Sequence, residues 1–156
     1  MSTFDTANQA VDEVYKNLYP IINEVVEKYA KESDQIIKKV GANPDTLSKE
    51  ELRKYILKLS SEAYILNDVK ERAGLRRELA EMLYKENVAK IIGSTSGTQK
   101  DKDSAAVIAS TSEKMAELLH SKIESQLKTK ILGINNFIEN LKSVLISRIS
   151  EDKNIT

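Results

Sequence analysis

The chain has 156 residues, of which 31% are charged and only 5% aromatic, and it contains neither Trp nor Cys. The lack of cysteine excludes a disulfide framework, a thiolate metal site and a cysteine nucleophile. With 24 basic and 24 acidic residues the formal net charge is zero, and so few aromatic residues favour apolar stripes on long helices over a thick globular core.

The charge is unevenly distributed along the chain. Residues 1–36 carry three Lys against seven Asp and Glu, whereas residues 120–149 carry five Lys and Arg against two Glu. An acidic N-terminal end and a basic C-terminal end permit pairing between subunits and offer a polyanion one preferred surface. Ordinary solvated helix faces would carry the same charges.

Turn and membrane signals are scarce. Five Gly and two Pro leave few positions where a sheet would turn, so we expect an all-α protein. No stretch approaches the roughly 20 apolar residues of a membrane span, and Met1 is not followed by a signal-peptide pattern. We therefore expect a cytoplasmic protein that does not enter a membrane.

The first predicted element is an N-terminal helical arm over residues 1–41. Apolar residues spaced three or four apart predict a helix from Thr6 to Val40. Pro20 lies inside it and predicts either a kink or a second helix starting there, because proline removes a backbone hydrogen bond. Gly41 and the turn residues after it end the helix.

The main body is expected over residues 47–150, beginning with a helix over 48–92. Ser48 and Glu51 have the spacing of a capping box at its start. An interior glycine, Gly74, marks a weak point, a close helix crossing or a bend. The apolar positions assigned to its packing face are Leu52, Ile56, Leu59, Ala63, Leu66, Val69, Ala73, Leu79, Leu83 and Ile91.

A loop is predicted over residues 93–104, because Gly93 to Ser104 contains no apolar residue. A loop of this length is more often functional or mobile than inert. It lacks the Gly-Lys-Ser/Thr ending of a phosphate-binding loop, and no strand precedes it.

The last predicted helix, over residues 105–150, carries the clearest pattern. Its seam has the 4-3-4-3-4 spacing of a coiled-coil interface: Leu127, Ile131, Ile134, Ile138, Leu141 and Leu145. The expected fold is all-α, with long helices forming an elongated hairpin or bundle and a coiled-coil-like C-terminal helix. We expect the seam to contact the central helix and a second subunit in a homo-oligomer; a monomeric hairpin is the alternative.

No catalytic arrangement can be drawn from the sequence. The single histidine, His120, forms one Glu-x-x-His pair with Glu117, and a ferritin-like metal site would need a second copy. No nucleophile elbow or catalytic triad is present. We therefore expect no enzyme activity, no metal and no cofactor.

Basic residues near the predicted loop and on the last helix are candidate phosphate contacts. Lysines at such positions would follow a nucleic-acid backbone, and repetition around an oligomer would strengthen the effect. Tyr84 is an aromatic candidate for stacking on a base, or part of a helix interface. The candidate nucleic-acid-binding residues are Lys85, Lys90, Lys100, Lys102, Lys128 and Lys130.

The order of these features resembles the UvsY-type recombination mediators of tailed bacteriophages. The matching stretches are Leu66 to Glu78 continuing to Ile92, the following loop with Asp101 and Asp103, and the final helix around Leu141 to Arg148. The resemblance implies a non-enzymatic oligomer that binds single-stranded DNA, displaces a single-strand-binding protein and helps load a RecA-like recombinase. A phage-encoded protein of this kind would act in the host cytoplasm.

Two further functions fit the sequence. One is a phage structural or assembly protein, such as a scaffold, tail or adaptor component, in which the coiled-coil seam alone is needed. The other is an inhibitor or adaptor that binds a host protein through the acidic N-terminal arm.

Overall fold

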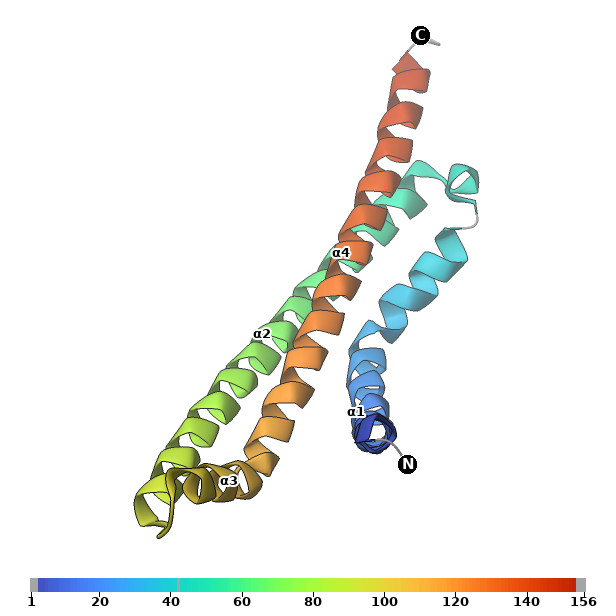
Figure 1. Ribbon diagram of the computed structural model, residues 1–156. Helices are drawn as coiled ribbons and strands as arrows, with labels where there is room; N and C mark the ends of the chain where they lie inside the picture. The colour runs from blue at the N-terminus through green and yellow to red at the C-terminus, as the bar shows by residue number, and fades with distance from the viewer. Residues whose placement is uncertain (1–2, 42, 154–156) are drawn as a thin grey trace. The chain divides into compact units, whose positions relative to one another are not determined.

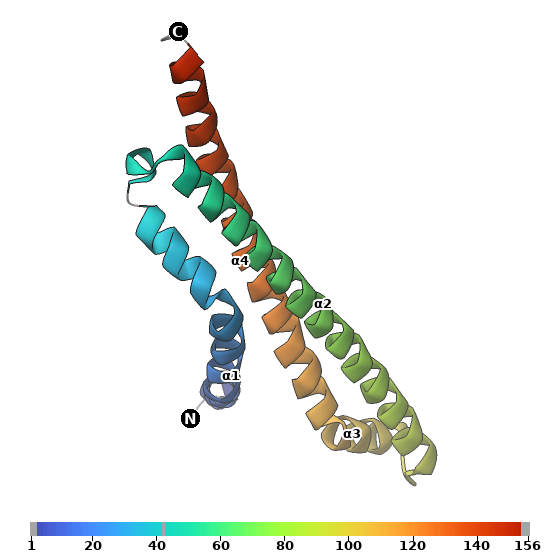
Figure 2. The ribbon, with the colours of Figure 1, turned by 180° about the vertical axis from the view of Figure 1, so that it is seen from behind.

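The computed structural model describes the backbone of residues 3–41 and 43–153 and the side chains of residues 11–41 and 43–151. It contains α1 (Thr3–Val40), a 3-10 turn η1 (Pro44–Thr46), α2 (Lys49–Ser94), α3 (Gln99–Ala109) and α4 (Thr111–Lys153), and no strand occurs in these residues (Figure 1). Helix α2 packs against α4, and the two run side by side in both views of the ribbon (Figure 1, Figure 2). The all-α prediction is confirmed.

Contacts group the chain into two compact units. Unit 1 comprises Met1–Ile22 and Lys70–Ser125, and unit 2 comprises Asn23–Val69 and Gln126–Thr156. Each unit takes one part of α1, α2 and α4, so the structure divides the chain differently from the arm and hairpin suggested by the sequence. Pro20 lies inside α1, which is one helix rather than two.

Unit 2 has a core of three helices with the same seven-residue repeat. On each helix the positions seven apart are at most 5% exposed: Val26, Ser33 and Val40 on α1; Leu52, Leu59 and Leu66 on α2; Leu127, Ile134 and Leu141 on α4. Such a repeat keeps one face of each helix turned toward its neighbours. The one polar member, Ser33, donates its hydroxyl to the carbonyl of Ala30 at 2.8 Å, so its burial leaves no unsatisfied donor.

Ion pairs join α1 to both other helices of unit 2. Lys130 on α4 donates to the two carboxylate oxygens of Asp34 at 2.8 and 2.6 Å, and Lys58 on α2 pairs with Glu32. The second half of α1 is thus a full member of this bundle.

Unit 1 packs through small residues. Ala73, Gly74 and Ala80 on α2 are buried, and a Cβ at Gly74 would lie 3.3 Å from a carboxylate oxygen of Glu124 on α4. Arg77 donates to the same carboxylate at 3.1 Å. Of the three readings left open for Gly74, the structure supports a close helix contact.

The connection between α2 and α3 is shorter than the sequence suggested. The predicted loop over 93–104 is wrong at both ends. Helix α2 continues to Ser94, and Thr98 and Asp101 form a capping box that starts α3 at Gln99. Gly97, just before this cap, has a φ of +124°, which favours glycine. The predicted helix over 105–150 is also interrupted at Ser110, where α3 ends and α4 begins.

Candidate functional site

Three of the six candidate DNA-contact lysines are engaged by carboxylates. Lys85 and Lys90 each pair at 2.7 Å with a glutamate one turn earlier, Glu81 and Glu86, and the hydrogen bonds from these lysines lower the pKa of both carboxyl groups. Lys130 is held by Asp34 within the unit 2 bundle. Each of these charges is balanced locally, which weakens its attraction for a phosphate.

The other three lysines lie in different places. Lys100 is exposed and Lys102 half-buried in the first turn of α3, and Lys128 is exposed on α4. Lys100 and Lys102 belong to unit 1 together with Lys85 and Lys90, whereas Lys128 belongs to unit 2. The six candidates are therefore divided between the two units.

Neither unit is basic as a whole. The residues of unit 1 include 11 Lys and Arg against 12 Asp and Glu, and those of unit 2 include 13 against 12. Sequence-independent binding to nucleic acid is carried by an excess of positive charge on the contacting surface. Any such surface here must be local rather than a property of a whole unit.

The C-terminal seam lies in the interior of unit 2. Leu127, Ile134, Ile138 and Leu141 are at most 5% exposed within a single chain, and Ile131 and Leu145 are half-buried. Helix α4, which carries the seam, packs against α2, as predicted for the central helix. The six residues assigned to oligomerisation consequently leave little apolar surface for a second subunit, and the homo-oligomer stays a prediction.

The side chains of His120 and Tyr84 both interact with basic residues of unit 1. Burial lowers the pKa of His120, and the nearby Arg76 lowers it further. The ammonium group of Lys114 lies 5.3 Å from the centre of the Tyr84 ring, a cation–π contact within unit 1. Within the described part of the chain no three His, Cys, Asp or Glu side chains gather as metal ligands would.

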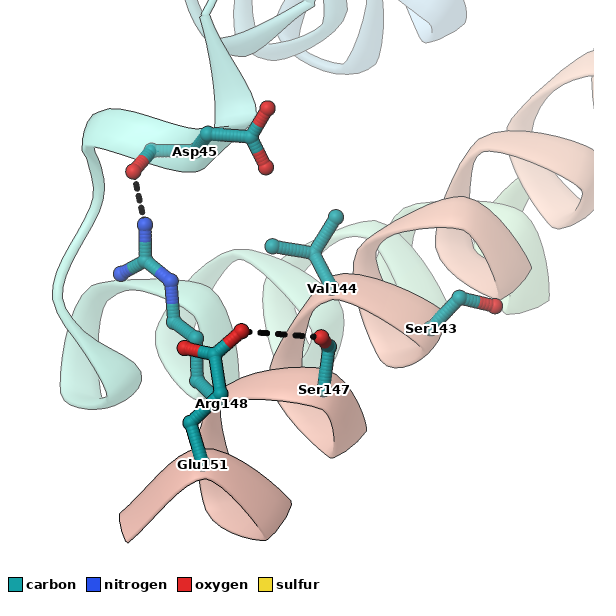
Figure 3. A pocket seen from close by; sticks show the side chains of 6 residues that line it. All are labelled: Asp45, Ser143, Val144, Ser147, Arg148 and Glu151. Carbon is teal, nitrogen blue, oxygen red and sulfur yellow. Dashed lines mark hydrogen bonds between the residues drawn. The ribbon is translucent and has the colours of Figure 1, made fainter. Parts of the chain in front are cut away.

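A polar hollow of about 520 Å³ opens near the end of unit 2 (Figure 3). Arg148 spans it and donates to the backbone carbonyl of Asp45, while Ser147 donates to Glu151 at 3.4 Å. The carboxylates of Asp45 and Glu151 face the same space, so an anion would meet repulsion there. The remaining lining comes from Ser143 and Val144.

An apolar face of α2 in unit 1 is left uncovered. We call Leu75, Leu79, Met82 and Leu83 the outer stripe; their exposed fractions are 58%, 49%, 66% and 53%. The prediction that Leu79 and Leu83 lie on the packing face of this helix is wrong. Ala73 and Ala80, which are 5% and 7% exposed, face inward instead.

The outer stripe had a recognisable signal in the sequence. Leu75, Leu79 and Met82 repeat at four and three residues, and Ala73 and Ala80 repeat at seven on the opposite side of the same helix. Two apolar periodicities on one helix indicate two contact faces. Only the packing shows which of them the chain itself covers.

Comparisons with known protein families, with curated proteins and with solved structures give no match. None of the helices over residues 3–41 and 43–153 has a stretch long and apolar enough to cross a membrane.

Proposed function

We propose that the protein is a non-enzymatic assembly protein that self-associates through the outer stripe of α2. The observation that carries this proposal is that the four large apolar side chains of the outer stripe are exposed on one face of α2, while the other face of the helix is packed. Single exposed apolar residues are ordinary on protein surfaces, but a contiguous apolar patch marks an interaction site.

The placement of the stripe supports a binding role rather than a packing defect. Its helix is already anchored on the other side by the ion pair between Arg77 and Glu124 at 3.1 Å. A partner would therefore meet a preformed helix, and no folding cost would reduce the free energy of binding. Helix-in-groove and coiled-coil recognition use residues at this spacing.

Sedimentation velocity over a range of protein concentrations tests the proposal. The wild-type chain of 17.5 kDa is expected to sediment as a heavier species as its concentration rises. A variant with Leu79→Asp and Met82→Asp is expected to remain at the monomer mass and to keep its helical circular dichroism. The matched control is Leu132→Asp, a leucine of unit 2 that is 61% exposed outside the stripe.

Wild-type protein that stays monomeric at every concentration would contradict self-association. Equal association of the wild-type protein and the double variant would contradict the role of the stripe.

A second proposal is the mediator function implied by the resemblance: binding of single-stranded DNA without base specificity, together with a single-strand-binding protein and a RecA-like recombinase. The exposure of Lys100 and Lys128, which are not held in any of the ion pairs described above, supports it. Association of several chains would multiply these two charges.

Titration of a labelled oligonucleotide at several salt concentrations tests the second proposal. Each phosphate neutralised on a single strand adds about 0.7 to the slope of log affinity against log salt. Changing both lysines to Ala is expected to lower the affinity equally for all sequences and to flatten the slope. No binding by wild-type protein at low salt would refute the mediator function and leave the assembly function standing.

A further inference from the structure

The outer stripe belongs to a longer coiled-coil pattern with charged ends. Arg72, Leu75, Leu79, Met82 and Glu86 are spaced 3, 4, 3 and 4 residues apart, which is the a/d rhythm of a two-helix interface. The apolar members lie in the middle, a basic residue stands at the N-terminal end and an acidic one at the C-terminal end. The opposite side of the helix is occupied by the packing of unit 1.

We infer that the occupant of this face is the same face of a second copy of this chain, running antiparallel. This inference rests on the proposed assembly function and specifies its partner. In the antiparallel arrangement an a position faces a d position, so Leu79 packs against the partner's Met82, and the twofold axis passes midway between this contact and its symmetry copy. Leu83 widens the contact on one side.

Charges beside the stripe select this orientation. Glu78 and Lys85 lie seven residues apart on the same flank of the stripe, and their side chains are 63% and 70% exposed. With Leu79 opposite the partner's Met82, Glu78 is level with residue 83 of the partner and lies within two residues, about 3 Å along the axis, of the partner's Lys85. The twofold axis repeats this contact, so two Glu78–Lys85 ion pairs form across the interface.

A parallel pair would bring like charges together. In that arrangement each a position faces its own copy, so Arg72 would face the partner's Arg72 and Glu86 the partner's Glu86. Lys85 would lie opposite the partner's Lys90. Repulsion between these like charges disfavours the parallel pair. The antiparallel pair is therefore favoured both by this repulsion and by its own ion pairs.

The ion pairs orient the interface, while the apolar residues supply its affinity. Lys85 pairs with Glu81 within its own helix at 2.7 Å, and both side chains are exposed. Exchange of this weak pair for an equally exposed one across the interface changes the binding free energy little. Leu75 to Leu83 span about two helical turns, so the apolar contact is small, and we expect a reversible dimer rather than a permanent one.

Charge reversal tests the antiparallel inference. Glu78→Lys is expected to weaken self-association about fivefold or more, because two attractive contacts become repulsive. Lys85→Glu is expected to weaken it similarly. An equimolar mixture of the two variants is expected to form heterodimers in preference to either homodimer, because each repulsive set then meets its complement.

The matched control is Glu139→Lys. Glu78→Lys removes the pair of Glu78 with Arg77 at 3.5 Å within α2, and Glu139→Lys makes the same charge change and removes the pair of Glu139 with Lys142 at 2.7 Å within α4. It lies in unit 2 and is expected to leave association unchanged. Circular dichroism of each variant reports whether the helices remain folded.

Different experimental results would contradict the antiparallel pair and the assembly function. If Lys85→Glu strengthens self-association, the pair is parallel, because the new carboxylate then faces the partner's Lys90. If neither reversal alters association that Leu79→Asp abolishes, the stripe binds a second copy in another register. Both results overturn the antiparallel pair and leave the assembly function intact, whereas a chain that never self-associates overturns both.

Discussion

Replacement of Ile134 by Ala distinguishes an intramolecular core from a subunit interface. Ile134 is 1% exposed within one chain, whereas Ile146 on the same helix is 63% exposed. The two positions therefore form a matched pair in which the same atoms are removed from different surroundings.

The expected loss for Ile134→Ala is about 2–5 kcal/mol, since a buried methylene deletion loses transfer free energy and leaves a cavity. In a chain of this size that loss lowers the melting temperature by about 5–15 °C. Ile146→Ala is expected to change the free energy of unfolding by less than about 0.5 kcal/mol, because little apolar surface is buried there.

Urea unfolding followed by circular dichroism, at two protein concentrations tenfold apart, measures both variants. The difference between Ile134→Ala and the wild type is expected to be the same at both concentrations. A difference that depends on protein concentration would show that a second subunit covers Ile134. Equal effects of the two substitutions would refute the packing described for unit 2.

Two further predictions concern local features. Burial and the neighbouring Glu32 raise the pKa of Glu62. Glu62→Gln is therefore expected to raise the melting temperature at pH 7, and the gain should disappear as the pH falls below 4.5, the ordinary pKa, where the wild-type carboxyl is itself neutral; a constant gain would refute this cause. Thr98→Ala removes the cap of α3 and is expected to cost about 1 kcal/mol, seen as faster amide exchange in that helix alone; unchanged exchange would contradict the cap.

The capping-box spacing in the sequence correctly predicted the start of α2. Ser48 and Glu51 form the capping box expected from their spacing: the amide of Ser48 donates to Glu51 at 2.8 Å and the amide of Glu51 to the Ser48 hydroxyl at 3.2 Å. The second capping box, at Thr98 and Asp101, lies in a segment whose lack of apolar residues predicted a loop. The first turn of a helix can be entirely polar when a cap satisfies its backbone donors.

Periodicity alone did not show which apolar face the chain covers. The seam through Leu127 and Ile134 has coiled-coil spacing, and that spacing is the same for a partner in the same chain and one in another. On α2 the larger residues at Leu79 and Leu83 suggested the core, but the small residues Ala73, Gly74 and Ala80 are the buried ones. These outcomes depend on long-range packing, which the sequence pattern does not contain.

The six candidate lysines do not form one DNA-contact surface within a unit, for a related reason. Sequence position showed which lysines lie near a helix end, but not that Lys130 would meet Asp34, a residue 96 positions earlier in the chain. Ion pairs of this kind depend on how the helices align.

A distance between two copies of the chain tests the central claim most directly. Because the chain has no cysteine, a spin label on Ala89→Cys, an exposed position beside the outer stripe, reports only one site per copy. In the antiparallel pair residue 89 is level with residue 72 of the partner, and a rise of 1.5 Å per residue places the two labels about 25 Å apart along the axis. Pulsed electron paramagnetic resonance is expected to give an intermolecular distance close to this value, which Leu79→Asp should abolish. A separation of about 15 Å or less, as parallel helices would give, or no coupling between copies, would contradict the account.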